Sequence, residues 1–354
     1  MKAVVKAEPQ PGIRLEDIPV PTVGPEEVLI RVKAVGLCGS DVHIYEWAGG
    51  FEHLKKYLPM VLGHEFAGEV VEAGNRVSGF HRGDRVTSET GRTCGRCVYC
   101  LTGKMTLCDQ RLGLGRIGIE QKGAMAEYVL CHGSLLHRIP EGVSFEEAAM
   151  SEPTAVALNA LDQVEIFPGD CVVVLGAGPI ALTLAQGAKA AGAFPVVVTG
   201  LTQDQSRLSL ARALGADETI DVEKADPVAK AKDLTGGLGP AKVFEVSGSA
   251  RAFNQGLDMV RKGGVLVAVG IYPENISVDV TRRLVREMKA IRGVFGGSRL
   301  AWSRALHLMG SGKIRLAPLI THRLPLEKAD QGFRACLEKK AMKVILFPDS
   351  SGFS

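Results

Sequence analysis

The sequence lacks any long apolar run. No stretch approaches the roughly 20 apolar residues that a membrane-spanning helix needs. Residues 1–6 are interrupted by lysine too early to form the hydrophobic region of a signal peptide. We therefore expect a cytoplasmic protein with no membrane partner.

The chain also lacks an excess of charge of either sign. It has 42 Lys and Arg against 39 Asp and Glu among 354 residues, a formal net charge of +3. No basic block stands out, and Arg282-Arg283 is only a pair, so nucleic acid is not an expected partner. A length of 354 residues exceeds what one hydrophobic core usually supports, which predicts two domains.

Eight cysteines are present although no secretory signal is recognisable. In a reducing compartment, clustered cysteines bind metal more often than they form disulfides. Cys94, Cys97, Cys100 and Cys108 follow the pattern C-x2-C-x2-C-x7-C in a polar lobe. Two-residue gaps let thiolates converge on one tetrahedral ion, and four thiolates leave no open position. This predicts a structural zinc site, with an iron–sulfur cluster or free thiols as alternatives.

A second set of metal-binding residue types is dispersed along the chain. Cys38 opens the run Cys-Gly-Ser-Asp-Val-His, His64 and Glu65 follow a glycine, and Glu152 precedes an apolar helix. Taken singly, these residues have ordinary interpretations: a small buried hydrophobe, a satisfied polar side chain and a first-turn acid. Together, a thiol, an imidazole and carboxylates suit a catalytic zinc, which keeps one position open for substrate.

Local patterns divide the chain into two structural classes. Up to about residue 90, short alternating segments with Gly and Pro spacers predict a largely antiparallel β domain. From residue 171, an apolar run leads into Gly176-Ala177-Gly178-Pro179-Ile180-Ala181 and then an apolar-faced helix. This is a G-x-G-x-x-A turn, whose glycines let the backbone approach a pyrophosphate at the helix N-terminus.

Strands and helices alternate after this turn, which predicts a doubly wound parallel sheet of six strands. An α/β domain that binds no dinucleotide is the alternative. The expected strands cover residues 171–175, 195–199, 218–220, 242–246, 265–269 and 291–295, and the expected helices cover 205–214, 228–234 and 251–260.

We expect three segments in chain order. Residues 1–154 form a zinc-binding catalytic domain with the cysteine lobe at 91–109, and residues 155–295 form the dinucleotide-binding domain. Residues 296–354, with helices at 302–309 and 326–338 and a strand at 342–347, return to the first domain.

Several motifs together resemble the zinc-dependent medium-chain alcohol dehydrogenases over essentially the whole chain. They are Cys-Gly-Ser-Asp-x-His at 38–43, Gly-His-Glu-x-x-Gly at 63–68, the cysteine lobe, Gly-Ala-Met-Ala-Glu-Tyr-Val at 123–129 and the glycine turn. The resemblance implies a GroES-like β-rich catalytic domain plus a Rossmann domain, two zinc ions per chain, and NAD or NADP. Glu152 is similar to the polyol (sorbitol) and threonine 3-dehydrogenase branch, and the segments 43–47 and 321–326 resemble specifically the threonine 3-dehydrogenases.

Two positions depart from the pattern of this branch. Gly91 stands where threonine dehydrogenases usually carry a histidine, which argues against threonine as substrate. The second Rossmann strand ends at Gly200 without the acid that binds the ribose hydroxyls of NAD, and Asp204 is the nearest carboxylate. Gly200, Thr202 and Arg207 are therefore candidates to accommodate the 2′-phosphate of NADP, with Arg207 as a solvated helix residue as the alternative.

The resemblance also implies roles for individual residues. Cys38 and His64 bind the catalytic zinc, Glu65 and Glu152 are further ligands, directly or through the bound water, and Asp41 fixes the orientation of His64. Ser40 accepts the hydroxyl proton and passes it, through the ribose or a water, to His43, which exchanges it with solvent. The implied cofactor contacts are Gly176, Gly178, Pro179, Ile180, Arg207, Ser247, Gly248, Val269 and Gly270.

The expected function is reversible oxidation of a secondary alcohol, such as a polyol or sugar alcohol, by hydride transfer to NAD(P). L-Threonine 3-dehydrogenase is one alternative, and a metal-free reductase of the same fold is another. A third is a zinc-stabilised binding protein without catalysis. The resemblance further implies a homo-tetramer or homo-dimer.

Overall fold

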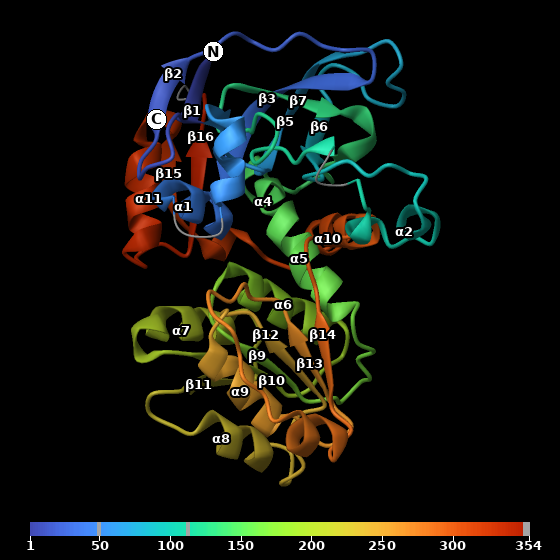
Figure 1. Ribbon diagram of the computed structural model, residues 1–354, viewed down its shortest axis with the longest axis vertical. Helices are drawn as coiled ribbons and strands as arrows, with labels where there is room; N and C mark the ends of the chain where they lie inside the picture. The colour runs from blue at the N-terminus through green and yellow to red at the C-terminus, as the bar shows by residue number, and fades with distance from the viewer. Residues whose placement is uncertain (48–50, 111–113, 350–354) are drawn as a thin grey trace. The chain divides into compact units, whose positions relative to one another are not determined.

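The computed structural model describes residues 1–47, 51–110 and 114–349 (Figure 1). Its chain divides into two compact units. The first unit comprises Met1–Glu152, Ser298–Gly310 and Leu316–Ser354, and the second comprises Pro153–Gly297 and Ser311–Arg315. The last five positions of the predicted C-terminal segment, 350–354, lie outside the described residues.

The second unit contains a six-stranded sheet in which all described neighbours are parallel, as predicted. Its order β11-β10-β9-β12-β13-β14 is that of a dinucleotide-binding Rossmann sheet. The strands are β9 (Val172–Leu175), β10 (Val196–Gly200), β11 (Glu218–Asp221), β12 (Lys242–Glu245), β13 (Val265–Ala268) and β14 (Ala290–Gly293). The last strand ends at Gly293, ahead of the predicted end at residue 295, and Phe295 is exposed.

Helices cover both faces of this sheet (Figure 1). α6 (Pro179–Ala190) and α7 (Gln205–Ala213) pack on β9, β10 and β11, while α9 (Ala250–Met259) packs on β12 and β13 with α8 (Pro227–Asp233) beside it. Because both faces are covered, the central strand β9 (Val172–Leu175) is apolar throughout and fully buried.

The first unit is built from two β-sheets whose described strands are mostly antiparallel. A small sheet has the order β2-β1-β4, and a larger one has the order β15-β16-β3-β5-β6-β8 with β7 also paired to β3. The N-terminal strands are β1 (Lys2–Lys6), β2 (Arg14–Asp17), β3 (Glu27–Gly36), β4 (Met60–Val61), β5 (Glu65–Ala73), β6 (Arg85–Ser88), β7 (Tyr128–His132) and β8 (Leu136–Arg138). The helices are α1 (Gly39–Glu46), α2 (Val98–Leu101), α4 (Phe145–Ala149) and α5 (Ser151–Leu161), which continues into the second unit.

The C-terminal part of the chain completes the larger sheet of the first unit. β16 (Lys343–Phe347) pairs antiparallel with β3, and β15 (Ile320–Pro325) pairs parallel with β16. α11 (Ala329–Leu337) packs on these strands, and α10 (Arg299–Gly310) also belongs to the first unit. The core of the unit is therefore assembled from both ends of the sequence, with Val35 of β3, Phe66 of β5 and Val344 of β16 in one cluster. Among the described helices, none has the length and apolar character needed to cross a bilayer.

Candidate active site

Three candidate ligands meet where two central strands of the first unit run side by side. Cys38 follows the end of β3, while His64 and Glu65 stand at the start of β5. These strands are antiparallel and Gly36 pairs with Glu65, so the end of one lies beside the start of the other. One ligand atom from each of Cys38, His64 and Glu65 lies within 4.8 Å of the others. The fold thus brings residues from distant motifs into one cluster.

The direction in which the chain enters His64 is set by close contact between two turns. Gly63 has a φ of +92°, and Gly118 has a φ of +72°. A Cβ atom at Gly118 would lie 2.3 Å from the carbonyl oxygen of Gly63, so only glycine fits. The second turn is held by Arg116, whose guanidinium donates two hydrogen bonds to Glu120 at 2.6 and 3.0 Å. This turn therefore supports the main chain directly before His64.

Asp41 lies in the first turn of α1 and faces the imidazole of His64. Its Oδ2 accepts a hydrogen bond from the main-chain N–H of Cys38 at 3.0 Å, and its Oδ1 lies 3.6 Å from His64 Nδ1. These two buried atoms, Oδ1 and Nδ1, have no hydrogen-bond partner. Burial alone would lower the pKa of His64, but the charges of Asp41 and Cys38 outweigh it and hold this pKa well above its usual range. Because Nδ1 faces the carboxylate, Nε2 is the nitrogen left for a metal ion.

The sequence did not reveal the partner of Glu65. Lys343, at the start of β16, donates one hydrogen bond to Glu65 Oε2 and another to the carbonyl of Leu37 at 2.9 Å. Both side chains of the ion pair are at least 96% buried, with exposures of 4% and 1%. In the sequence, Lys343 is visible only as a single lysine at the start of an apolar strand. No sequence motif connects it to Glu65, which lies 278 positions earlier.

Glu152 is half-buried near the start of α5 and is not a member of the group formed by Cys38, His64 and Glu65. Its charge contributes to the raised pKa of His64 after the larger effects of burial, Asp41 and Cys38. Glu152 therefore lies close enough to influence the cluster electrostatically. A thiol, an imidazole and two carboxylates around unpaired buried atoms form a donor set that fits zinc.

The two predicted proton carriers lie on α1. Ser40 is half-buried and His43 is exposed, three residues apart on one side of the helix. The imidazole of His43 stacks on Phe51 with a centroid distance of 5.9 Å, and Phe51 in turn stacks on His53 at 6.5 Å. α1 therefore begins next to Cys38 and carries His43, which stacks with Phe51 and, through it, His53.

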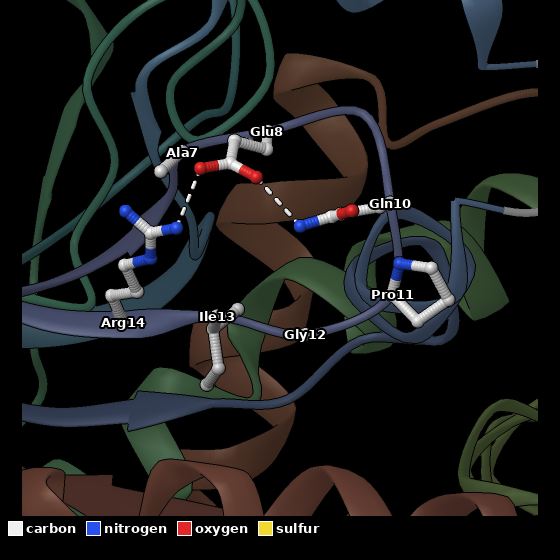
Figure 2. A pocket seen from close by; sticks show the side chains of 7 residues that line it. All are labelled: Ala7, Glu8, Gln10, Pro11, Gly12, Ile13 and Arg14. Atoms are coloured by element: carbon white, nitrogen blue, oxygen red, sulfur yellow. Dashed lines mark hydrogen bonds and ion pairs between the residues drawn. The ribbon is translucent and has the colours of Figure 1, made fainter.

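A buried lysine anchors the other end of α1. Lys6 is 0% exposed, and its ammonium donates hydrogen bonds to the carbonyls of Gln10, Gly12 and Tyr45. Tyr45 belongs to the last turn of α1. The loop between β1 and β2 encloses a hollow of about 80 Å³, and Figure 2 shows how Glu8 links the two sides of the loop. Lys6 thus ties this loop to the helix that carries the predicted proton carriers.

The four lobe cysteines form the second cluster. Their four Sγ atoms all lie within 4.8 Å of one another, and those of Cys94 and Cys100 are 4.0 Å apart. Sulfurs at 2.3 Å from a tetrahedral zinc would be about 3.8 Å apart, so the spacing fits. Hydrogen bonding from the main-chain N–H of Cys100 lowers the pKa of Cys97 to about 6, which favours a thiolate. None of the eight cysteines forms a disulfide.

The predicted dinucleotide turn joins β9 to α6 in the second unit. Gly176 has a φ of +118°, a conformation that favours glycine, and a Cβ at Gly178 would meet no atom within 4 Å. Pro179 opens the twelve-residue helix α6, and Ile180 follows it. Free N–H groups and open space at a helix N-terminus form a site that fits a pyrophosphate.

Ser247 and Gly248 follow β12, and Val269 and Gly270 follow β13, at the carboxyl edge of the parallel sheet. A Cβ at Gly270 would lie 2.3 Å from the N atom of Gly248, so these two loops touch. A Cβ at Gly176 would lie 3.2 Å from the Cβ of Ser247. The structure therefore brings these four predicted cofactor residues next to the glycine turn.

The end of β10 has a different arrangement from the one that NAD enzymes usually show. A Cβ at Gly200 would lie 3.2 Å from the Cβ of Asp204 and 3.1 Å from the side chain of Leu208. Asp204 thus lies against the strand end, and its Oδ2 accepts a hydrogen bond from Leu201 N at 3.1 Å. Arg207 NH1 lies 3.7 Å from Asp204 Oδ1. A carboxylate and a guanidinium are both present where the adenine ribose would bind.

Comparison with known proteins agrees with this geometry. Residues 24–141 match the family model of the alcohol dehydrogenase GroES-like domain, and residues 179–311 match that of the zinc-binding dehydrogenases. The chain is 40% identical to a sorbitol dehydrogenase of Halalkalibacterium halodurans, covering 98% of this chain and 99% of that protein. It is 38% identical to an L-threonine 3-dehydrogenase of Bacillus velezensis, with coverage of 98% and 99%. A zinc-binding dehydrogenase from Sinorhizobium meliloti, solved with NADP, superimposes with a TM-score of 0.89 at 30% identity, covering 98% and 99% of the two chains.

The chain therefore belongs to the zinc-dependent medium-chain dehydrogenases. It is a zinc-dependent, NAD(P)-linked oxidoreductase of alcohols or polyols, and the expected combination of a GroES-like and a Rossmann domain is confirmed.

Proposed function

We propose that the protein reversibly oxidises a secondary hydroxyl of a small polyol or sugar alcohol at the cluster formed by Cys38, His64 and Glu65. The observation that carries this proposal is the convergence of these three ligand atoms within 4.8 Å, with Asp41 behind the imidazole. A closed structural site would use four protein ligands, whereas three leave one position for substrate.

Residues of the cluster have different proposed roles at the catalytic zinc. Cys38 and His64 bind the catalytic zinc, Asp41 fixes the ring of His64 through Nδ1, and Glu65 and Glu152 supply carboxylates next to it. When bound, zinc supplies the Lewis acidity that lowers the pKa of an alcohol hydroxyl, and nicotinamide accepts the hydride.

Ser40 and His43 are proposed to remove the proton. Ser40 Oγ accepts the proton of the substrate hydroxyl as it releases its own proton through a water to the imidazole of His43, which then gives a proton to solvent. The exposure of His43 and its place three residues along α1 from Ser40 support this route.

The proposed dinucleotide site consists of the glycine turn and the two loops at the carboxyl edge of the parallel sheet. Gly176, Gly178, Pro179 and Ile180 hold the pyrophosphate at the N-terminus of α6. Ser247, Gly248, Val269 and Gly270 form the opposite wall, and Arg207 reaches the adenine ribose. The four lobe cysteines hold the second zinc, which stabilises the fold without taking part in catalysis.

The proposal is tested by following nicotinamide absorbance with NAD and NADP against sorbitol, xylitol, 2,3-butanediol and threonine. We expect turnover of a polyol or diol. A preference for threonine would replace polyols by the amino acid as substrate, in keeping with the threonine dehydrogenase relative. Gly91 and the sorbitol dehydrogenase relative favour the polyol.

Zinc content separates this enzyme from the metal-free and non-catalytic alternatives. The parent should hold two zinc ions per chain, and His64→Ala should hold one and lose turnover. His132→Ala is the matched control, because His132 also faces a carboxylate, Glu26, at 3.3 Å but lies outside the cluster. Full activity in His64→Ala would refute the proposed catalytic site.

A homo-oligomer is also proposed, with β14 as the contact between copies. β14 is the edge strand of the parallel sheet, and no described strand pairs with its outer side (Figure 1). Ile291 of β14 is 38% exposed, Phe295 just beyond the strand is 60% exposed, and an unpaired sheet edge readily accepts another strand. Light scattering should find a dimer or tetramer for the parent and a smaller species for Ile291→Glu.

A further inference from the structure

Glu245 is a buried carboxylate that no sequence pattern singled out. It is the last residue of β12 and is 0% exposed. Oε1 accepts hydrogen bonds from the main-chain N–H of Ser247 at 2.8 Å and from the Ser247 hydroxyl, while Oε2 accepts from the N–H of Gly248 at 3.1 Å and from the hydroxyl of Tyr272 at 2.6 Å. The carboxylate is thus surrounded by four donors, none of which is charged.

These donors belong to two different loops. Ser247 and Gly248 follow β12, whereas Tyr272 follows β13. The main-chain carbonyl of Glu245 also accepts hydrogen bonds from Val269 N at 2.8 Å and Gly270 N at 3.1 Å. One residue therefore holds both loops, one mainly through its side chain and the other mainly through its main chain.

The position of Glu245 in the sheet places it at a specific point of the Rossmann unit. In the parallel register Glu245 pairs with Leu175, the last residue of β9, directly before the glycine turn. The strand order reverses between β9 and β12, and doubly wound sheets bind their ligands in the crevice at this reversal. Ser247 lies against Gly176 across this point, with 3.3 Å between a Cβ at Gly176 and Ser247 N.

A buried carboxylate at this position lowers the stability of the fold unless its hydrogen bonds fix the structure of neighbouring segments. An ionised carboxylate loses its hydration on burial, and hydrogen bonds from fixed donors must replace it. The neighbouring strands end in apolar residues, Leu175 in β9 and Ala268 in β13, so the packing of the sheet does not require a carboxylate there. The hydrogen bonds go instead to the loops that form the wall of the crevice.

We propose that Glu245 is a positioning residue for the dinucleotide. Its carboxylate preorganises the 246–249 and 269–272 loops, so that binding NAD(P) does not have to order them. Glu245 itself does not contact the cofactor in this proposal, which rests on the function proposed above. Tyr272 acts with it as the link to the second loop.

The test is titration of the full chain with NADH and with NADPH, followed by nicotinamide fluorescence without any alcohol present. Glu245→Gln keeps the shape of the side chain, but its amide NH2 group cannot accept the two hydrogen bonds that one of the two carboxylate oxygens accepts. Because hydrogen bonds to charged groups are strong, we expect a dissociation constant raised about tenfold or more. Tyr272→Phe removes one donor and keeps the ring against Phe253, so a rise of about threefold is expected.

Asp217→Asn is the matched control for this experiment. Asp217 accepts a hydrogen bond from the main-chain N–H of Val196 at 2.7 Å and from Lys189 at 2.9 Å. It thus supports the same sheet, but Val196 begins β10, at the amino edge away from the crevice. Asp217→Asn should lower the melting temperature and leave the dissociation constants unchanged.

The outcomes separate this inference from the proposed function. A parent protein that binds neither dinucleotide refutes the proposed function. A parent that binds, with Glu245→Gln binding as tightly as Asp217→Asn, overturns the inference alone and leaves Glu245 as a purely structural residue. If Glu245→Gln does not fold, Tyr272→Phe decides in the same way, because weakened binding supports the inference and unchanged binding refutes it.

Discussion

The ammonium of Lys343 and the carboxylate of Glu65 form an ion pair that is almost completely buried beside Cys38. Burial alone would lower the pKa of Lys343. The nearby charges of Glu65 and Cys38 outweigh this effect and raise the pKa above its usual value. The charge of Lys343 is therefore maintained by the same residues that form the candidate metal cluster.

Replacement of Lys343 by methionine should be strongly destabilising. In protein stripped of zinc, the change leaves Glu65 as an unpaired buried charge, and breaking one side of a buried pair costs about 3–5 kcal/mol. Urea unfolding of the first unit measures the loss. The double variant Lys343→Met/Glu65→Gln should recover part of it, because no unpaired charge remains.

Lys340→Met is the control for this pair. Lys340 lies just before β16 and pairs with Glu338, but both side chains are exposed to more than half. An exposed pair contributes little because solvent screens it. If both lysine variants unfold at the same urea concentration, the buried pair does not have the importance assigned to it.

Lys6→Met should loosen the end of α1. The variant removes the donor for the carbonyls of Gln10, Gly12 and Tyr45. Only the bond to Tyr45 is fully buried, and an unsatisfied buried acceptor costs on the order of 1–3 kcal/mol. Hydrogen exchange measures the effect, and we expect faster exchange in α1 and in the loop between β1 and β2.

An exposed lysine such as Lys122 provides the comparison for Lys6, and Lys122→Met should leave exchange in α1 unaltered. Slower or unchanged exchange in Lys6→Met would show that its three hydrogen bonds do not hold the helix.

The Arg116–Glu120 pair makes stability depend on pH. Burial would raise the pKa of Glu120, but the guanidinium of Arg116 outweighs it and lowers this pKa from 4.5. A depressed carboxyl pKa contributes stability above the unfolded value, and this contribution is lost as pH falls through the folded value. Relative to the parent, Glu120→Gln should therefore be less stable at neutral pH, with the difference shrinking below about pH 4. A difference independent of pH would contradict this.

The two sheets illustrate what could be predicted from the sequence and what could not. Strands such as Val172–Leu175 and Val265–Ala268 are apolar runs separated by helices, so the local pattern predicted them, and five of the predicted strands match within about one residue at each end. β15 gave no such signal, because Ile320–Pro325 contains His322 and Arg323 and ends in proline, and it is a strand because it pairs with β16.

The same distinction applies to the site. Cys38, His64 and the lobe cysteines were predictable because metal ligands recur in short spaced motifs. Lys343 and Glu245 were not predictable, because their importance comes from burial and from partners that only the folded chain brings near. Buried charges outside motifs have no periodicity that would reveal them.

Removal of single cysteines should separate the two proposed zinc sites. Cys38→Ala should keep one zinc per chain and the parent melting temperature, since the lobe stays closed. Cys97→Ala should also lose zinc, but with a lower melting temperature, because the energy of a structural zinc is part of the folding energy. Metal analysis and calorimetry measure both, and Cys336→Ala, outside both clusters, should change neither the zinc content nor the activity.

Arg207→Ala should change the choice of dinucleotide. If the guanidinium of Arg207 contacts the 2′-phosphate, its loss raises the KM for NADP about tenfold or more, with little change for NAD. Asp204→Asn should have the opposite selectivity, because Asp204 is the carboxylate that lies against Gly200. Arg212→Ala is the matched control, since Arg212 is on the same helix but pairs with Glu218. Equal KM ratios in Arg207→Ala and Arg212→Ala would place Arg207 outside the cofactor site and leave Asp204 as the residue that selects NAD.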